Sequence, residues 1–322
     1  MENEKTRRSI LDEATKQKIR TDLRIDPESE ILNPLVDYVF KRIFTADDTN
    51  AKAALIDFIN SVLEYENDDT IVDLTIVNPE IAVARGGEKK SIFDIRAKYN
   101  NGRQAIIEMQ KAETSDFKRR SQHIISKAYA SQEISGFSYN KLEKVYLIAI
   151  TDFEINKEAN EYIKDYRFRD RKGNDLTDSQ TIVYLDLSKT EAILAKEVNE
   201  MENVEKWAIF FKHITDVSKK KILDKIIEGG AGIKMAANIL MEVSKEEEAR
   251  AYYESELIFE LDQNGRLRQA REQGVEHGIE QGIEQMVINM LKKNKYSVEE
   301  IAEAAEFSAE RIREIEKTLK KG

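Results

Sequence analysis

The sequence predicts an α/β protein in which a sheet domain is followed by an all-helical C-terminal region. Between residues 71 and 187, apolar and β-branched runs of strand length alternate with turn signals, which is typical of a sheet. Before and after that stretch, apolar residues recur at helical spacing. The three prolines, of which Pro79 is the last, all lie in the first quarter of the chain, so uninterrupted helices and strands can follow.

The composition excludes several classes of protein. The 322 residues are 41% hydrophobic and 35% charged, which favours a globular chain of about two units over a disordered or fibrous one. No apolar run approaches about 18 residues and no secretory signal follows Met1, so we expect a cytoplasmic protein with no membrane partner. The chain has no cysteine, which excludes disulfides, and only three histidines, which disfavours a zinc site or a His-based triad. Its formal charge of −10 disfavours a uniformly basic nucleic-acid binder.

The region before the sheet is predicted to be largely helical. Residues 1–32 are strongly charged and are interpreted as an arm or a frayed helix. Asn33 is a candidate N-cap, with Pro34 at the first helical position. A second helix is expected after Asn50, and the β-branched residues over 71–83 then indicate a first strand.

A hairpin is the most informative element of the predicted sheet. Its strands cover residues 91–99 and 104–110, and the segment between them contains Asn101-Gly102. Asn-Gly is a strong hairpin signal because both residues tolerate positive φ. One further helix and two strands complete the predicted sheet domain: 116–135, 145–150 and 181–187.

From about Lys189 the pattern is helical. Four regions are therefore expected: a charged arm over 1–32, the sheet core over 33–187, a helical region over 188–260, and a glycine-spaced amphipathic helix with a terminal helical hairpin over 261–322.

The last of these regions contains a four-residue repeat that begins at Gly274, Gly278 and Gly282. Each glycine weakens a helix by about 1 kcal/mol relative to alanine, and close approach by a second helix would compensate for that loss. We therefore expect a homo-oligomer formed through the helix over 270–290, the alternative being a repeat that is merely tolerated. Beyond it, Ser297 opens a short helix with a capping box, and residues 308–320 form another.

These two short helices resemble the outline of a helix-turn-helix motif. The second helix carries acidic residues in balance with basic ones, which favours a capping hairpin over DNA reading. A DNA-binding regulator that acts through residues 297–320 is therefore the less favoured alternative.

Three polar residues of the hairpin are predicted to converge: Asp94, Glu108 and Gln110. Glu108 and Gln110 share a face because side chains alternate across a strand, and pairing brings Asp94 within a residue or two of Glu108. Two carboxylates about 4 Å apart repel by about 4 kcal/mol at an effective dielectric constant of about 20. Either one of them keeps a proton, or Mg²⁺ (or Mn²⁺) lies between them. Strand carboxylates that simply face solvent are the alternative.

Local charge around this hairpin is compatible with an anionic partner. Residues 80–130 carry eleven basic and six acidic side chains, a net charge of +5 in an otherwise acidic chain. Such a patch could hold a phosphate backbone, although an ordinary solvated surface would show the same balance.

Seven short motifs, taken together, carry a resemblance to a known family. They are 33–44 (NPLVDYVFKRIF), 55–60 (LIDFIN), 77–80 (VNPE), 90–98 (KSIFDIRAK), 107–110 (IEMQ), 120–121 (RS) and 126–129 (SKAY). In combination they resemble the recombination-promoting nuclease (Rpn) and transposase family of the PD-(D/E)XK nuclease superfamily. The resemblance covers residues 33–155 well and the glycine-spaced tail loosely.

The resemblance implies a restriction-endonuclease-like core, which is a mixed sheet flanked by helices. It places Asp94 and Glu108 at the two acidic motif positions that bind Mg²⁺. Gln110 stands where the superfamily usually has lysine, and it would place the attacking water through hydrogen bonds. Asp37 lies where an acidic residue often joins the site, although at a helix start it also complements the dipole.

The implied function is Mg²⁺-dependent DNA endonuclease activity in recombination or transposition. Six residues of the basic stretch are candidate contacts to DNA, with packing or surface roles as the alternative for the last two: Lys98, Lys118, Arg119, Arg120, Gln122 and Tyr129. Because Gln110 replaces a lysine, a catalytically decayed nuclease-fold scaffold of a mobile element or defence system is an alternative.

Overall fold

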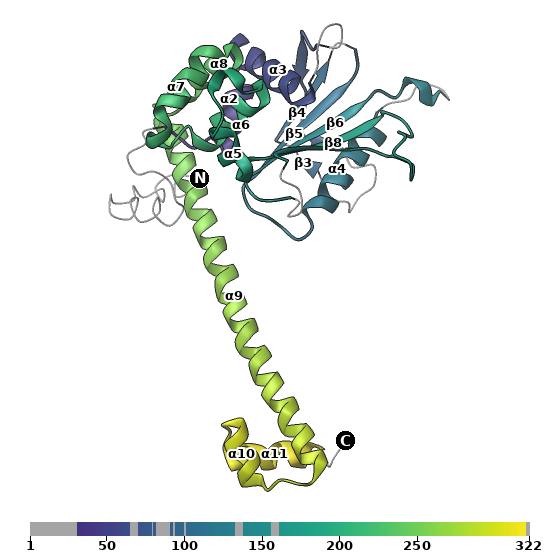
Figure 1. Ribbon diagram of the computed structural model, residues 1–322, viewed down its shortest axis with the longest axis vertical. Helices are drawn as coiled ribbons and strands as arrows, with labels where there is room; N and C mark the ends of the chain where they lie inside the picture. Colours follow the sequence, from purple (N-terminus) through teal and green to yellow (C-terminus); the bar gives the residue numbers. More distant parts are fainter. Residues whose placement is uncertain are drawn as a thin grey trace, which may run out of the picture. The chain divides into compact units, whose positions relative to one another are not determined.

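The computed structural model describes residues 31–64, 70–78, 80–81, 91–92, 94–99, 101–132, 138–155 and 161–319 (Figure 1). Residues 1–30 of the predicted arm over 1–32 lie outside the described ranges. Phe93 and Asn100 of the predicted hairpin also lie outside them. The chain forms two compact units, Met1–Leu257 and Ile258–Gly322. None of the helices in the described ranges combines the length and the apolar character that a membrane span requires.

A six-stranded mixed sheet forms the centre of the first unit, in the order β1-β4-β5-β6-β8-β7. The central strands β5, β6 and β8 run parallel, and the outer ones pair antiparallel. The predicted mixed sheet with flanking helices is thereby confirmed. The strands are β1 (Leu74–Ile76), β4 (Ile95–Tyr99), β5 (Gln104–Gln110), β6 (Val145–Thr151), β7 (Ile163–Tyr166) and β8 (Gln180–Asp186), with β2 (Glu80–Ile81) and β3 (Ser91–Ile92) in a separate ribbon.

The hairpin between β4 and β5 closes through a three-residue loop rather than a two-residue Asn-Gly turn. Tyr99 N donates to Arg103 O over 2.9 Å, and Gly102 N donates to Tyr99 O over 3.0 Å. Gly102 has a φ of +87°, which favours glycine. The register pairs Ile95 with Ile107, so one further step places Asp94 opposite Glu108.

Replacing Gly102 with alanine is expected to lower the free energy of unfolding by about 1–2 kcal/mol, because the left-handed backbone is strained for any residue with a Cβ. The added Cβ would also lie 2.8 Å from Glu143 Cγ. Urea unfolding would measure the change. Gly173→Ala separates the two causes, because Gly173 has a φ of +90° but no atom within 4 Å of an added Cβ, so it should lose stability through backbone strain alone and lose less than Gly102→Ala. Unchanged stability of Gly102→Ala would show that the loop does not need this conformation.

Helices cover the sheet and extend beyond one of its edges (Figure 1). In the first unit they are α2 (Asp37–Thr45), α3 (Thr49–Leu63), α4 (Phe117–Ala130), α5 (Thr190–Leu194), α6 (Asn203–His213), α7 (Lys220–Gly229) and α8 (Ala231–Val243). Helix α4 packs against β6 and β8, and α8 packs against α2 and α3. The helices α5 to α8 therefore belong to the same compact unit as the sheet. The four predicted regions otherwise stay a prediction.

Helix α2 begins at Asp37 instead of Pro34. The expectation of an Asn33 cap was wrong because the Asn33 side chain closes a turn of its own, in which Leu35 N donates to Asn33 Oδ1 over 2.9 Å. Val36 is the N-cap residue. Asp37 consequently lies in the first turn of α2, where its charge complements the helix dipole.

An aromatic cluster fixes α2 and α3 against α6. Phe44 and Phe58 lie with ring centroids 5.8 Å apart, and Trp207 lies 5.4 Å from Phe58. The indole Nε1 of Trp207 also donates to Asp57 Oδ2 over 2.8 Å. These rings are fully buried, so α2 and the side chains on its open face are held rigidly beside the sheet.

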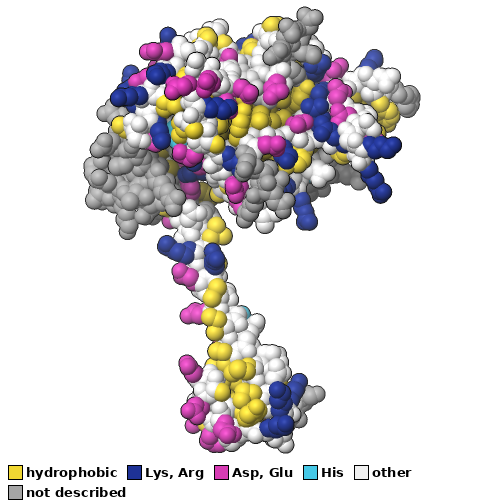
Figure 2. All heavy atoms as spheres, viewed as in Figure 1, with side chains coloured by type: hydrophobic (Ala, Val, Ile, Leu, Met, Phe, Trp, Pro, Cys, Tyr) yellow, Lys and Arg dark blue, Asp and Glu magenta, His cyan; other side chains and the backbone are white. Residues whose placement is uncertain are grey.

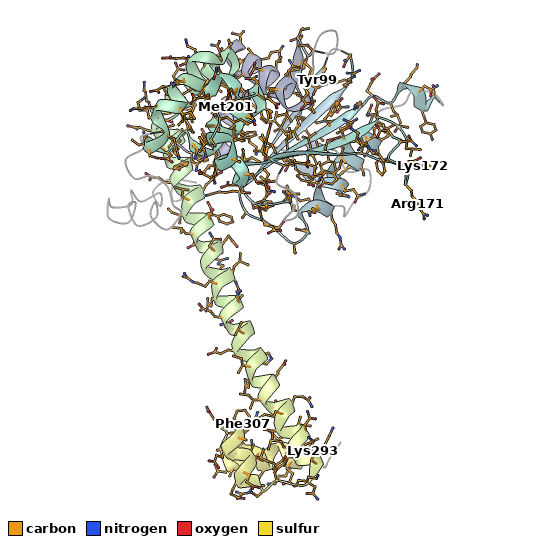
Figure 3. All side chains as sticks on the ribbon, in the orientation of Figure 1. Tyr99, Arg171, Lys172, Met201, Lys293 and Phe307 are labelled. Atoms are coloured by element: carbon orange, nitrogen blue, oxygen red, sulfur yellow. The ribbon has the colours of Figure 1, made fainter. Side chains whose placement is uncertain are left out.

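The second unit contains most of α9 (Glu247–Lys293) together with α10 (Val298–Ala305) and α11 (Ala309–Leu319). The predicted capping box is present, since Glu300 N donates to Ser297 Oγ over 3.2 Å. A small apolar core joins the three helices, and Phe307 packs against it (Figure 3). Arg311 and Arg313 lie within 3.4 Å of glutamates on α11 and α10. Such neutralised cations favour the capping hairpin over a DNA-reading helix.

Candidate functional site

Two buried carboxylates lie on neighbouring strands of the sheet. Asp94 immediately precedes β4 and Glu108 lies in β5, and their side chains are only 16% and 10% exposed. Asp94 Oδ2 accepts a hydrogen bond from Met109 N over 2.7 Å. This bond ties Asp94 to β5 at the residue that follows Glu108.

Glu108 faces helix α4. Glu108 is in register with Ala149 on β6, and Ala149 packs against Phe117 at the start of α4. Arg120, one turn further along α4, lies with Nη2 3.9 Å from Glu108 Oε2 and donates to Gln110 Oε1 over 2.6 Å. Because Arg120 reaches both residues, Glu108 and Gln110 lie on one face of the sheet.

A lysine that the sequence analysis did not select completes the site. Lys41 Nζ on α2 lies 2.7 Å from Asp37 Oδ2 and 3.5 Å from Asp94 Oδ1. The available signal was the spacing of four between Asp37 and Lys41, which brings both side chains to one side of a helix. Lys41 therefore links Asp37 to the pair of buried carboxylates.

The electrostatics of the pair differ from those of surface acids. Burial, followed by the charges of Glu108 and Asp37, raises the pKa of Asp94 to about 8. Burial raises the pKa of Glu108 to about 7, against the opposing influence of Arg120. Within the described part of the chain, the buried Oε1 of Glu108 has no hydrogen-bond partner. At neutral pH the site therefore retains a proton, or it requires a further cation.

Comparison with known proteins identifies the family. A family model described as PD-(D/E)XK nuclease family transposase matches residues 34–270. The chain belongs to this family. No curated protein and no solved structure shows significant similarity to it.

Membership in the PD-(D/E)XK nuclease family transposases confirms the resemblance carried by the short motifs. The match reaches beyond β8 and through α8, so the helices that pack against α2 and α3 belong to the family's unit. A nuclease- or transposase-like function follows at the level of the family.

The residues of this family member fit a divalent cation. Carboxylate oxygens are the ligands that Mg²⁺ prefers, and Mg²⁺ is commonly bound through one or two carboxylates with water and phosphate in the other positions. Asp94 and Glu108 offer such oxygens, and Glu108 Oε1 is unpaired among the described residues. In the same ranges, no group of three Asp, Glu or His side chains forms a ready-made metal site. The fit to a divalent cation therefore depends on Asp94 and Glu108 alone among the described residues.

The other candidate contacts to DNA are spread over the first unit. Lys118, Arg119 and Gln122 are exposed on α4, and Tyr129 packs against an apolar cluster beneath α4. Lys98 lies four residues along β4 from Asp94, about 13 Å away at the usual rise of a strand. Of the six candidates, Arg120 is therefore the one that reaches the carboxylates directly.

Proposed function

We propose that this protein is a Mg²⁺-dependent endonuclease that hydrolyses phosphodiester bonds of DNA in the cytoplasm during recombination or transposition. The observation that carries the proposal is the pair of buried carboxylates, Asp94 and Glu108, whose pKa values are both raised. Burying two acids side by side is costly unless a cation balances them. Membership in a nuclease family supplies the reaction class.

Each residue of the site has a role in this proposal. Asp94 and Glu108 would hold Mg²⁺ (or Mn²⁺), which when bound lowers the pKa of water and stabilises charge on phosphoryl oxygens. The backbone N–H of Met109 fixes the Asp94 carboxylate beside Glu108, where it would serve as a ligand. Arg120, held by Gln110 Oε1, is placed to contact a phosphate of the substrate.

Two residues would together replace the lysine that the superfamily usually has: Gln110 would orient the attacking water, and Lys41 would supply the positive charge. Gln110 Nε2 donates to Ala112 O over 3.0 Å, and its second hydrogen is available to orient the attacking water. Lys41 supplies a positive charge 3.5 Å from Asp94 Oδ1, and Asp37 positions Lys41. The reaction would be an in-line attack of water on the phosphodiester.

A nicking assay on supercoiled plasmid tests the proposal. We expect nicked circles with Mg²⁺ or Mn²⁺ and none in the presence of a chelator, because the carboxylate pair needs the ion. Parallel incubations with linear duplex, single-stranded DNA and RNA would define the preferred substrate. Absence of cleavage of every substrate with either ion, between pH 6 and pH 9, would contradict the endonuclease.

A catalytically decayed scaffold is the second candidate. The observation that favours it is that both ends of the Gln110 amide are engaged, one by Arg120 and the other by Ala112 O. Calorimetry separates the two functions, because an intact carboxylate pair binds Mn²⁺ at millimolar concentration. No heat of binding would favour the scaffold.

We also propose that α9 mediates self-association over residues 270–290. Val275 and Ile279 are more than half exposed, and Figure 2 shows apolar side chains (yellow) open to solvent along this helix. An added Cβ at Gly274, Gly278 or Gly282 would meet no atom within 4 Å. A second helix could approach this open stripe closely.

Ile279→Glu is expected to convert an oligomer of the full chain to the monomer, because it places a charge in the apolar stripe. Light scattering would measure the molar mass. Glu276→Gln on the same helix is the matched control and should leave the mass unchanged. A monomeric mass for the unaltered protein at micromolar concentration would rule out the association.

A further inference from the structure

A cavity of about 290 Å³ lies between α4 and the strands β7 and β8 at one side of the sheet. Its size is close to the lower limit of pockets that bind small ligands, about 300 Å³. Tyr166, Phe168 and Tyr184 contribute to its lining. Tyr184 is buried, whereas Tyr166 and Phe168 are 40% and 49% exposed. Two aromatic rings are therefore open to a flat ligand that enters the cavity.

Two amide side chains also line this cavity, Gln122 from α4 and Gln180 from β8. The Oε1 atom of Gln180 is buried, and no donor among the described residues lies within hydrogen-bond distance of it. A buried acceptor without a partner is costly. Because this oxygen is closed off from solvent in the structure, a ligand N–H could satisfy it only after the Gln180 side chain rotates towards the cavity.

The cavity is bordered by positive charge. Lys118 and Arg167 both line it. Arg167 is paired with Asp165 at 2.8 Å, whereas Lys118 forms no ion pair with any residue that the structure describes. An aromatic slot with amide groups and a free cation at its border matches a nucleotide, which combines a flat ring, hydrogen-bonding edges and a phosphate.

The cavity and the carboxylate pair share one face of the sheet. Glu108, Ala149 and Tyr184 form a continuous row across β5, β6 and β8. Two strand spacings separate Glu108 from Tyr184, about 10 Å. Phe117 bridges the two places, since its ring lies 6.0 Å from that of Tyr184 and 5.3 Å from the Arg120 guanidinium carbon. Because Phe117, Ala149 and Tyr184 are buried, a nucleic-acid strand that contacts both places would pass over the exposed side of α4, past Arg120 and Lys118.

We infer that this cavity is a nucleobase pocket, which takes one unstacked base of single-stranded DNA while Lys118 contacts the adjacent phosphate. The inference rests on the proposed function and deepens it, because it names unpaired DNA as the class of substrate. Bases in a duplex are stacked and paired, so they would have to be flipped out of the helix before they could enter.

Fluorescence anisotropy on the full-length protein in chelator tests this pocket without any cleavage. Two labelled single strands of equal length are compared, one with normal bases and one with consecutive abasic sites. We expect the abasic strand to bind about tenfold more weakly, and Phe168→Ala to weaken binding of the normal strand by about the same factor. For the abasic strand, Phe168→Ala should change the affinity by less than about twofold, because the base is already missing.

Matched variants separate the base from the phosphate. Tyr139→Ala removes another exposed aromatic ring, outside the cavity, and should change neither affinity. Lys118→Ala should weaken both strands equally, while Lys172→Ala should have no effect, because Lys172 projects away from the sheet beyond β7 (Figure 3). Thermal unfolding verifies that each variant is folded. Because Phe168 is half-exposed, its replacement should leave the fold intact.

The outcomes distinguish the pocket from the nuclease. If Phe168→Ala weakens both strands equally, or neither, the nucleobase pocket is overturned. Equal affinity of the unaltered protein for the normal and abasic strands would also overturn it. If the binding measurements agree with the nucleobase pocket but no nucleic acid is cut with Mg²⁺ or Mn²⁺, only the proposed hydrolysis is wrong. If cleavage occurs and the pocket fails, the endonuclease stands without this substrate class.

Discussion

Asp94→Asn and Glu108→Gln are each expected to reduce DNA nicking by about 10²- to 10³-fold, the loss typical of removing one charged stabiliser from an active site. The same substitutions are expected to raise the free energy of unfolding of the metal-free protein by about 1–3 kcal/mol at pH 8. The two effects have opposite signs because a single feature, a buried pair of like charges, causes both.

The gain in stability follows from the surroundings of the two side chains. Glu108 is buried and the side chain of Asp94 is only 16% exposed, and Glu108 Oε1 has no partner among the described residues. An amide in place of either carboxylate removes the repulsion and still offers an oxygen. In Asp94→Asn, that oxygen could continue to accept from the backbone N–H of Met109. A purely structural role for Asp94 would instead predict a loss of stability in this variant.

Plasmid nicking and urea unfolding, performed on the same preparations, measure the two effects. Asp224→Asn is a suitable control, because Asp224 pairs with Lys220 on an exposed helix surface, and such pairs contribute little. It should alter neither activity nor stability appreciably. Full nicking activity in either Asp94→Asn or Glu108→Gln would remove these residues from the proposed site.

The sequence predicted those parts of the site that depend on local structure. Asp94, Glu108 and Gln110 belong to one hairpin, so alternation along a strand and the Asn101-Gly102 signal sufficed to bring them together. The loop differs in length from the predicted turn, but the strand pairing is unaffected. A prediction that rests on neighbouring residues tolerates such an error.

Residues that reach the site through tertiary packing were harder to find. Lys41 approaches Asp94 only because the aromatic cluster of Phe44, Phe58 and Trp207 fixes α2 beside the sheet. Arg120 was selected for its charge, yet its contact with Glu108 depends on how α4 packs over β6 and β8. The sequence carries no period or motif that encodes these approaches.

The cavity beside β7 illustrates the same limit more strongly. β7 spans four residues, two of them charged, so it carries no strand signal of its own. Its pairing with β8 places Tyr166 opposite Ile182 and closes one side of the cavity. Lys118 and Gln122 were selected as DNA contacts from the sequence, but their relation to Tyr184 is a property of the assembled sheet.

The stability of the metal-free protein is expected to fall by a few kcal/mol as the pH rises from about 4 to about 8. The pKa values of Asp94 and Glu108 are raised in the folded protein, to about 8 and about 7, above their ordinary values. Between these limits the folded state binds more protons than the unfolded state, so raising the pH favours unfolding. The stabilising contribution is complete below about pH 4 and is lost as the pH passes the folded-state values.

Urea unfolding at pH 5 and pH 8.5 in chelator measures this dependence. Asp94→Asn is measured under the same conditions, so that the contributions of all other titratable groups cancel in the difference between the two proteins. The unaltered protein should lose more stability between the two pH values than the variant does. Adding Mg²⁺ at pH 8.5 should restore stability to the unaltered protein only, because a bound ion would balance the charge that the carboxylates acquire when they lose their protons. An identical pH dependence in both proteins would mean that Asp94 is ionised in the metal-free fold, and that the site does not need a cation to hold its charge.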